Sequence, residues 1–427
     1  MVAYRRTISD EKDYIVVYSL KEDKSISTVD VKNIDPQSHY FISNDYLILT
    51  ASRHSKGYKH DWDISTAFSL DFKNNKIEPL IKHGETLHRE TTLSRDVRVK
   101  ISSRQTGMGR IVGQDTDGKV VYMPAFVSEQ HPKSAFYSAY GRQSDSNYSL
   151  LKVDVSGKGL LGVHSQGTPN TRNFFLDDKG NVIARENLNE KTNKHSIEVP
   201  EKAKWRTLYS YKSAIVTHKF EGLNEDFTAL IFSRSDKDQS HTSNNMYLQL
   251  SLADGAVKPF EQMKLNRDTS EVISNDHGVV LGVRYAGLSP DYQLSDAKLH
   301  KRVQSILSYF SEHSVHLTDW TDDWKHIVVR VEGTQFAGDY FLFSENQEPK
   351  LLTHSRPDIN QEDLNPITTT RLKARDGLSI PLILTVPKSK ANNIKNLPAI
   401  VMPHGGPDSH DQIGFNYMAQ ALASKVI

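Results

Sequence analysis

Apolar and polar residues follow one repeated local pattern from residue 14 to about residue 353. In each repeat, an apolar or aromatic strand leads into a polar turn, and a second strand follows. Repeats of this kind begin at Tyr14, Ala67, Ser149, Met246 and Asp339. Alternating side chains on either side of an Asp-Gly, Ser-Gly or Asn-Asn turn are typical of β-hairpins. We therefore predict a series of hairpins along this part of the chain.

Further strands are predicted between these hairpins, at residues 46–50, 214–217, 279–283 and 326–330. Strand units that recur in series favour a β-propeller, in which small sheets are arranged radially and only short edges remain open. The spacing is too irregular to count blades. The pattern alone also allows a large β-sandwich or several small β domains.

One segment departs from the strand pattern and predicts a helix, between Gln293 and Phe310. Its apolar residues recur at helical spacing and form a broad face: Leu294, Ala297, Leu299, Val303, Ile306, Leu307 and Phe310. A helix inside a β array is usually a lid or a packing element, and sometimes a gate for substrate.

A domain boundary is predicted near Pro366, after the polar run 358–363. Residues 1–360 are assigned to the propeller, with its first strands missing at the N-terminus, and residues 361–427 to the truncated start of a second domain. A hairpin is expected from residues 368–374 and 379–386, joined by an Asp-Gly turn.

The segment that follows combines a predicted strand, a glycine turn and a helix. Leu397–Met402 is a short apolar run that predicts a buried strand of a mostly parallel sheet. His404, Gly405, Gly406 and Pro407 then turn the chain. Residues 415–425 predict a helix whose sheet-facing side carries Phe415, Met418, Ala419 and Leu422. An α/β-hydrolase places part of its oxyanion hole in a loop of this kind.

Composition narrows the function classes only slightly. The 53 basic and 52 acidic residues nearly cancel, so no partner role for nucleic acid or an anionic membrane is indicated. With no cysteine, the chain has no disulfide, thiolate metal site or cysteine nucleophile. We expect no metal site, because His83 and His88 lack the spacing of a zinc helix, and no cofactor, because no glycine-rich phosphate loop occurs.

The C-terminal motifs resemble the entry into the catalytic domain of the prolyl oligopeptidase family, in its acylaminoacyl-peptidase-like and dipeptidyl-peptidase-like branches. The resemblance is carried by Ala374–Pro381, Leu384–Pro387 and Leu397–Pro407, and more diffusely by Thr171–Gly180. It implies a β-propeller that caps an α/β-hydrolase domain with a Ser-Asp-His triad. It also implies that the backbone N–H of Gly406 helps to form the oxyanion hole.

The triad itself is not visible in the sequence. No G-x-S-x-G occurs; the nearest segment, Gly162–Gly167, has valine in place of the first glycine of the motif. The expected function is therefore that of a fragment of a serine peptidase acting on short peptides, with the triad beyond Ile427. The propeller would select substrates by size, and the chain alone would be inactive. A non-catalytic propeller that binds or scaffolds, and an esterase on the same fold, remain alternatives.

Two further expectations follow from the predicted strand and the N-terminus. Without later strands beside it, Leu397–Met402 would leave an open apolar edge through which the chain could self-associate. No signal peptide or membrane span is visible, so the location is cytoplasmic by default, and periplasmic if the N-terminus is truncated.

Overall fold

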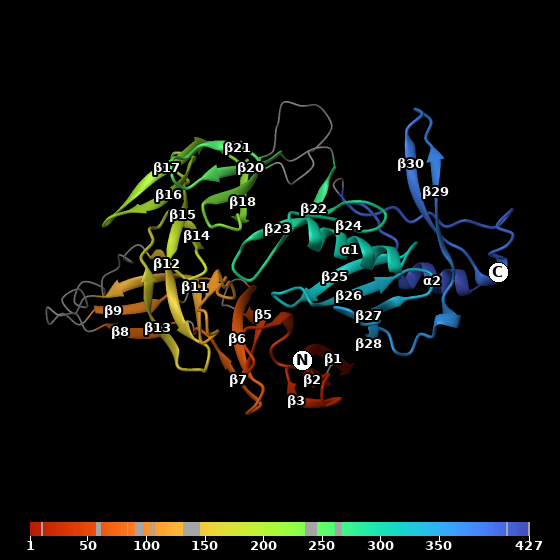
Figure 1. Cartoon of the computed structure of the whole chain (residues 1–427), viewed down its shortest axis with the longest axis horizontal. Helices are drawn as coiled ribbons and strands as arrows, with labels where there is room; N and C mark the ends of the chain where they lie inside the picture. The colour runs from red at the N-terminus through yellow and green to blue at the C-terminus, as the bar shows by residue number, and fades with distance from the viewer. Residues whose placement is uncertain are drawn as a thin grey trace. The chain divides into compact units, whose positions relative to one another are not determined.

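The computed structural model describes residues 1–9, 12–56, 61–82, 84–89, 97–102, 105, 107–130, 146–234, 246–260, 267–406 and 409–425. The chain is mainly β, with seven successive antiparallel sheets followed by a two-stranded hairpin (Figure 1). It divides into two compact units. The first comprises Met1–Phe232, Gln249–Lys258 and Asp276–Val279; the second comprises Ser233–Leu248, Pro259–Asn275 and Val280–Ile427.

The first two sheets of the first unit follow one another directly in sequence. One has three strands in the order of the chain: β1 (Val2–Ser9), β2 (Lys12–Ser19) and β3 (Lys24–Asp30). The next has four strands, also in chain order: β4 (Pro36–Phe41), β5 (Tyr46–Lys56), β6 (Asp61–Asp71) and β7 (Lys76–Pro79).

The third sheet has six strands, and two four-stranded sheets follow it. The third sheet runs in the order β13-β12-β11-β9-β8, with β10 paired to β11: β8 (Thr86–Arg89), β9 (Val97–Ile101), β10 (Gly113–Gln114), β11 (Val120–Gln130), β12 (Asn147–Asp154) and β13 (Gly159–Ser165). The two sheets after it keep chain order: β14 (Thr171–Leu176), β15 (Val182–Asn189), β16 (Lys194–Glu201) and β17 (Lys204–Lys212), then β18 (His218–Leu223), β19 (Ala229–Arg234), β20 (Met246–Ser251) and β21 (Val257–Pro259).

The second unit holds two sheets, a hairpin and two α-helices. The sheets are β22 (Thr269–Ser274), β23 (Val280–Tyr285) and β24 (Asp291–Leu294), then β25 (Ser314–Trp320), β26 (His326–Glu332), β27 (Ala337–Ser344) and β28 (Lys350–His354). The hairpin and helices are β29 (Ile367–Lys373) and β30 (Ser379–Thr385), α1 (Ala297–Tyr309) and α2 (Tyr417–Ser424). Two short 3-10 turns lie at Gln361–Asp363 and Lys388–Lys390.

Strand β5 shows how the sheets of the first unit pack. Successive side chains of a strand point to opposite faces of the sheet. Leu47 and Leu49 are fully buried in a cluster with Ile15 and Val17 of β2. Ile48, between them, is fully buried in a separate cluster that includes residues of β11 and β12. The second sheet is therefore covered by apolar side chains on both faces.

Helix α1 confirms the helix predicted between residues 293 and 310. Asp296 caps its N-terminus by accepting a hydrogen bond from the backbone N–H of Leu299 (2.7 Å). Val303 and Ile306 are buried against the neighbouring sheets of the second unit, β22–β24 and β25–β28. The helix is thus a packing element of this unit.

All five predicted hairpins are confirmed, as strand pairs β2–β3, β6–β7, β12–β13, β20–β21 and β27–β28. The strand predicted at residues 214–217 is wrong. This segment connects β17 to β18, and Ile215 and Val216 are exposed. β-propensity reflects how well a side chain fits a half-buried pleated surface, and here no neighbouring strand provides that surface.

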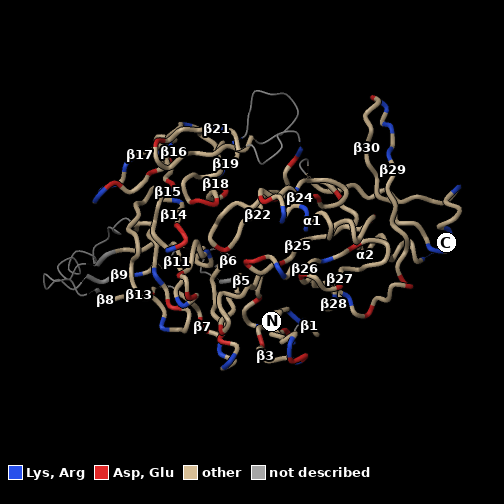
Figure 2. The backbone as a smooth tube through the Cα atoms, viewed as in Figure 1, with Lys and Arg blue, Asp and Glu red and all other residues tan. Residues whose placement is uncertain are grey.

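Acidic and basic residues are interspersed along the described chain (Figure 2). Helix α1 is an exception, because it carries Lys298, Lys301 and Arg302 and no acidic residue. In the described part of the chain, no helix is long and apolar enough to cross a membrane.

The first sheet contains an ion pair with a testable pH dependence. Arg5 donates from Nε and Nη2 to the Asp13 carboxylate (2.7–3.0 Å), and Thr7 donates to the same group (3.0 Å). The hydrogen bonds from Arg5 lower the pKa of Asp13, although burial opposes this shift. Because the folded-state pKa lies below the unfolded value, this stabilisation is present above about pH 4. It is lost as the pH falls through the folded-state pKa.

We expect Asp13→Asn to lower the free energy of unfolding by about 1–3 kcal/mol at neutral pH, because it removes the charged partner of Arg5. The difference between wild type and variant should shrink as the pH falls below about 4. Urea titrations at several pH values measure both effects. Asp226→Asn is the control, since Asp226 is exposed and loses the same charge. Equal effects of the two substitutions would contradict the assignment.

Candidate functional site

The glycine turn predicted as an oxyanion loop is an exposed loop in the second unit. His404, Gly405 and Gly406 are all exposed, and Pro407 lies outside the described residues. Gly406 has φ +70°, a left-handed conformation that glycine adopts without strain. Apart from each glycine's own chain neighbours, no heavy atom of the described residues lies within 4 Å of the position that a Cβ would take at Gly405 or Gly406. The backbone at this turn is therefore open to an approaching group.

His404 makes only a local contact in this loop. Its Nδ1 lies 3.4 Å from the carbonyl oxygen of Gly405. This contact joins two residues that are neighbours along the chain.

The strand predicted at Leu397–Met402 is wrong. This segment has no regular secondary structure, and Val401 is 86% exposed. A strand requires a neighbour to pair its backbone groups. The nearest strand in sequence, β30, pairs with β29, and no described strand pairs with Leu397–Met402.

The helix predicted at residues 415–425 is present as α2, but its buried face differs from the prediction. Asn416 caps the helix by accepting a hydrogen bond from Ala419 N–H (3.0 Å). Met418 and Leu422 are 45% and 42% exposed. The buried residues of the helix are Gln420 and Ala423.

A pair of side-chain amides fixes α2 against the segment that precedes β29. The side chain of Gln420 accepts from Asn365 N–H (2.8 Å) and donates to the Asn365 carbonyl (3.1 Å). The side chain of Asn365 donates to the Gln420 carbonyl (3.2 Å) and to Ser424 Oγ (2.8 Å), and it accepts from Lys388 N–H (3.0 Å). We call Asn365 and Gln420 the amide clamp. Both are nearly fully buried, so the clamp satisfies polar groups that water cannot reach.

A second anchor holds the chain just before α2 against the sheet β25–β28. Glu332 of β26 is buried and accepts a hydrogen bond from Arg330 (2.5 Å). Arg356 lies 3.6 Å from the same carboxylate and donates to the Ala337 carbonyl. The Arg356 guanidinium also lies 4.4 Å from the ring centre of Phe415, in the geometry of a cation–π contact. Phe415 therefore packs on a charged side chain rather than on a sheet.

Sequence reasoning missed both anchors. The sequence places a boundary near Pro366 and gives the helix a sheet-facing side of Phe415, Met418, Ala419 and Leu422, and it singles out neither Asn365 nor Gln420. The signal available was weak: Gln420 and Ala423 are three residues apart and share a helix face. Nothing in the sequence indicated that Asn365 would lie opposite them.

Two hydroxyl–histidine contacts occur elsewhere in the described chain. Ser344 Oγ lies 2.9 Å from His326 Nδ1, across strands β27 and β26. Thr217 Oγ1 lies 2.9 Å from Nδ1 of the buried His218, whose Nε2 contacts Tyr209 Oη (3.1 Å). A serine-hydrolase triad needs a carboxylate on the second ring nitrogen of the base. In the contact of His218, that second nitrogen lies against the hydroxyl of Tyr209 and not against a carboxylate.

Glu186 and His316 lie outside the loop and have strongly perturbed pKa values. Burial raises the pKa of Glu186 in β15 to about 7, although Arg110 and Arg172 oppose the shift. Burial, together with Arg330 and Arg284, lowers the pKa of His316 in β25 to about 4. His316 is therefore neutral at physiological pH, and Glu186 titrates close to it.

Solved structures of several peptidases have a fold similar to that of this chain. Acylaminoacyl peptidase from Pyrococcus horikoshii is 14% identical over 99% of this chain and 61% of its own, with a TM-score of 0.54. Acylaminoacyl peptidase in complex with Z-Gly-Gly-Phe-chloromethyl ketone matches with the same values. Apo prolyl oligopeptidase B from Galerina marginata is 10% identical over 91% of this chain and 54% of its own, with a TM-score of 0.51.

At the level of fold, the chain matches the prolyl oligopeptidase family. It spans about 61% of the length of the acylaminoacyl peptidases that it resembles. No family model and no curated protein matches the sequence.

The amide clamp provides a test of how α2 is held. We expect Asn365→Ala to remove the hydrogen bonds that the Asn365 side chain donates to the Gln420 carbonyl and to Ser424 Oγ. Their loss should cost the docking of α2 about 1–3 kcal/mol, because the buried groups lose their partners. Hydrogen exchange of the α2 amides should accelerate, while exchange in β25–β28 stays unchanged. Asn392→Ala, at an exposed asparagine, is the matched control. Unchanged α2 exchange in Asn365→Ala would show that other contacts hold the helix.

Proposed function

We propose that residues 1–427 are the β-propeller and the first part of the catalytic domain of a serine peptidase of the prolyl oligopeptidase family, which hydrolyses short peptides. The boundary lies near residue 360, before the segment that carries the amide clamp. The propeller restricts access by size, so short or unfolded peptides are the substrates. The triad lies beyond Ile427.

The observation that carries this proposal is the His-Gly-Gly-Pro turn in a chain of this fold. Gly406 has the left-handed backbone that glycine permits, and the space above it is open. A backbone N–H in such a turn can donate to the oxygen of a tetrahedral intermediate. The fold shared with acylaminoacyl peptidase, over 99% of this chain, supports the same assignment.

In the proposed reaction, a serine hydroxyl attacks the carbonyl carbon of the peptide. A histidine accepts the serine proton and then passes it to the leaving amine, while an aspartate orients the histidine. The carbonyl oxygen becomes an alkoxide, which the Gly406 N–H stabilises. Water then hydrolyses the acyl-enzyme by the same proton transfers.

The apolar residues that are exposed near the turn are those that further strands of a hydrolase sheet would cover. Ile400, Val401, Met418 and Leu422 are all exposed. Each would be covered if Leu397–Met402 became a strand between parallel neighbours and α2 packed on the resulting sheet. In residues 1–427 alone, the same side chains offer a surface for self-association.

The first test uses a fluorophosphonate probe on the product of the complete gene and on residues 1–427. We expect stoichiometric labelling of one serine in the complete product, because a triad activates its nucleophile. We expect no labelling of residues 1–427, and no hydrolysis of short peptides by them. Labelling of any serine within residues 1–427 would refute the proposed position of the triad. A complete product that is neither labelled nor active would favour a binding or scaffolding propeller.

The second test concerns the oxyanion donor, in the complete gene product. Gly406→Ala places a Cβ on a left-handed backbone and shifts the N–H. We expect kcat for a short peptide to fall by about 10²–10³-fold with little change in KM, as for the loss of one oxyanion donor.

Gly377→Ala is the matched control for Gly406→Ala. Gly377 also has positive φ (+87°) and open space at its Cβ position, but it lies in the exposed turn of the β29–β30 hairpin. It should retain wild-type kcat. If both variants lose activity equally, the loss comes from backbone strain and not from the oxyanion donor.

A further inference from the structure

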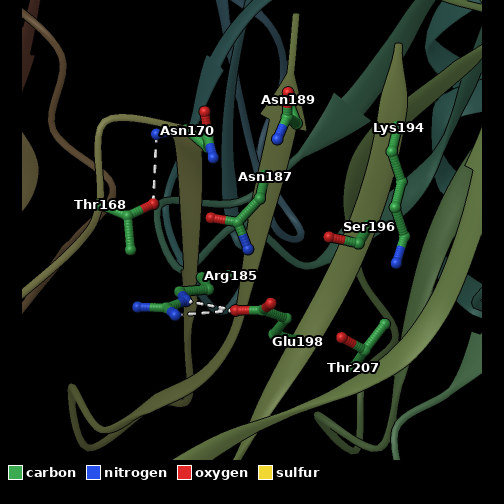
Figure 3. Close-up of a pocket in the computed structure, with 9 residues that line it drawn as sticks. All are labelled: Thr168, Asn170, Arg185, Asn187, Asn189, Lys194, Ser196, Glu198 and Thr207. Carbon is green, nitrogen blue, oxygen red and sulfur yellow. Dashed lines mark hydrogen bonds and ion pairs between the residues drawn. The ribbon is translucent and has the colours of Figure 1, made fainter. Parts of the chain in front are cut away.

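A polar groove lies on one face of the sheet β14–β17, within the first unit (Figure 3). Its volume is about 250 Å³. One water molecule needs only about 10–15 Å³ of such space, so the groove can hold a small organic molecule. Residues of β15, β16 and β17 line it, together with the loop that precedes β14.

Cross-strand pairing explains why polar side chains gather here. Arg185, Asn187 and Asn189 alternate along β15 and share one face of the sheet. Their partners on β16 are Glu198, Ser196 and Lys194, respectively. Residues directly opposite on neighbouring strands project to the same side. All six residues line the groove.

Asn187 presents an unsatisfied donor to the groove. Its side chain is 7% exposed, and its Oδ1 accepts from Thr171 Oγ1 (2.9 Å). Its Nδ2 is buried and has no hydrogen-bond partner. Figure 3 shows this nitrogen directed away from Asn189, toward the end of the groove where Arg185 and Glu198 lie. A buried donor without a partner costs about 1–3 kcal/mol, so a ligand with an acceptor oxygen is favoured at this point.

The one carboxylate in the groove is already neutralised. Arg185 donates from Nε and Nη2 to Glu198 (2.9 and 2.8 Å), and it lies 4.2 Å from the ring centre of Trp205. These contacts hold the pair rigidly and leave no net charge on it. The net positive charge of the groove therefore comes from Lys194.

Two lysines lie opposite one another at the end of the groove. Lys194 of β16 is the cross-strand partner of Lys212 of β17, and both are exposed. Like charges directly opposite destabilise a strand pair. Among the residues that the structure describes, neither lysine forms an ion pair. An anion bound beside Lys194 would relieve this repulsion.

We propose that this groove binds a small hydroxylated carboxylate, of the hydroxy-acid or sugar-acid class. The carboxylate lies beside Lys194, and an acceptor oxygen of the ligand accepts from Asn187 Nδ2. Ser196, Asn189 and Thr207 supply neutral hydrogen-bonding groups for ligand hydroxyls. The lining holds no large apolar side chain to favour a hydrophobic ligand. This site is independent of the proposed peptidase function.

Isothermal titration calorimetry on residues 1–427 with D-gluconate, D-glucose and inorganic phosphate tests the proposal. We expect saturable binding of gluconate, weaker binding of phosphate, and none of glucose, which lacks the carboxylate. Lys194→Gln should weaken gluconate binding at least about tenfold, because it removes a charged hydrogen-bond donor. Asn187→Asp should weaken it further, because it replaces the buried donor with a negative acceptor.

Lys191→Gln is the matched control, because Lys191 is exposed in the β15–β16 turn and does not line the groove. It loses the same charge and should bind gluconate as wild type does. Should Asn187→Asp fail to fold, Lys194→Gln decides alone, since its side chain is exposed. The proposal is overturned if gluconate does not bind, if Lys194→Gln and Lys191→Gln have equal effects, or if glucose binds as well as gluconate.

Discussion

The fold of the first unit depends on sheets that bury apolar side chains against their neighbours, and the sheet β4–β7 does so on both of its faces. Strand β5 shows the constraint most clearly, because Leu47 and Leu49 enter one core cluster while Ile48 enters another. Such a strand can neither shift its register by one residue nor lose a neighbouring sheet, since either change would expose fully buried side chains. Sheets in series are therefore stabilised by one another, and polar residues are confined to turns, edges and a few specialised faces.

The chain after residue 360 obeys a different constraint. Its helix α2 is held by amide hydrogen bonds to Asn365, and the residue before its cap, Phe415, is held by Arg356. Apolar burial contributes little there, because Ala423 is the one buried apolar residue of the helix. Leu364, before β29, and Val386, after β30, are also buried. Polar contacts depend on geometry and can fix an orientation without a large core. They explain how α2 keeps a defined place while Met418 and Leu422 remain exposed.

The sequence predicted the local elements well and their surroundings poorly. Alternation about good turn residues identified five hairpins, and helical spacing identified α1, because these signals arise within a few residues of one another. The predictions that failed needed information about neighbours. Residues 214–217 have strand-forming side chains but no pairing partner, and Leu397–Met402 is apolar but unpaired. The face of α2 was assigned from hydrophobicity, whereas the observed face is chosen by Asn365, 55 residues away in sequence. The sequence predicts a turn from His404 to Gly406, but its open backbone is apparent only from φ of Gly406 and the space around it.

The sheet β14–β17 has one face that packs against a neighbouring sheet and one face that is polar. Alternate residues of a strand point to opposite faces, so the two faces can differ in composition. On one face, His195 stacks on Tyr211 at 4.5 Å, and Tyr211 stacks on His218 of the next sheet at 3.9 Å. This aromatic contact joins neighbouring sheets, as Ile48 joins β5 to β11 and β12 and Leu47 joins β5 to β2. On the other face, Arg185, Asn187 and Lys194 form a polar groove that apolar packing does not need. Period-two alternation thus allows one sheet to pack against its neighbour with half of its residues and to present polar groups with the other half. A buried polar face costs stability unless its donors and acceptors form hydrogen bonds. On this face the Nδ2 of Asn187 is a buried donor to which the protein supplies no acceptor.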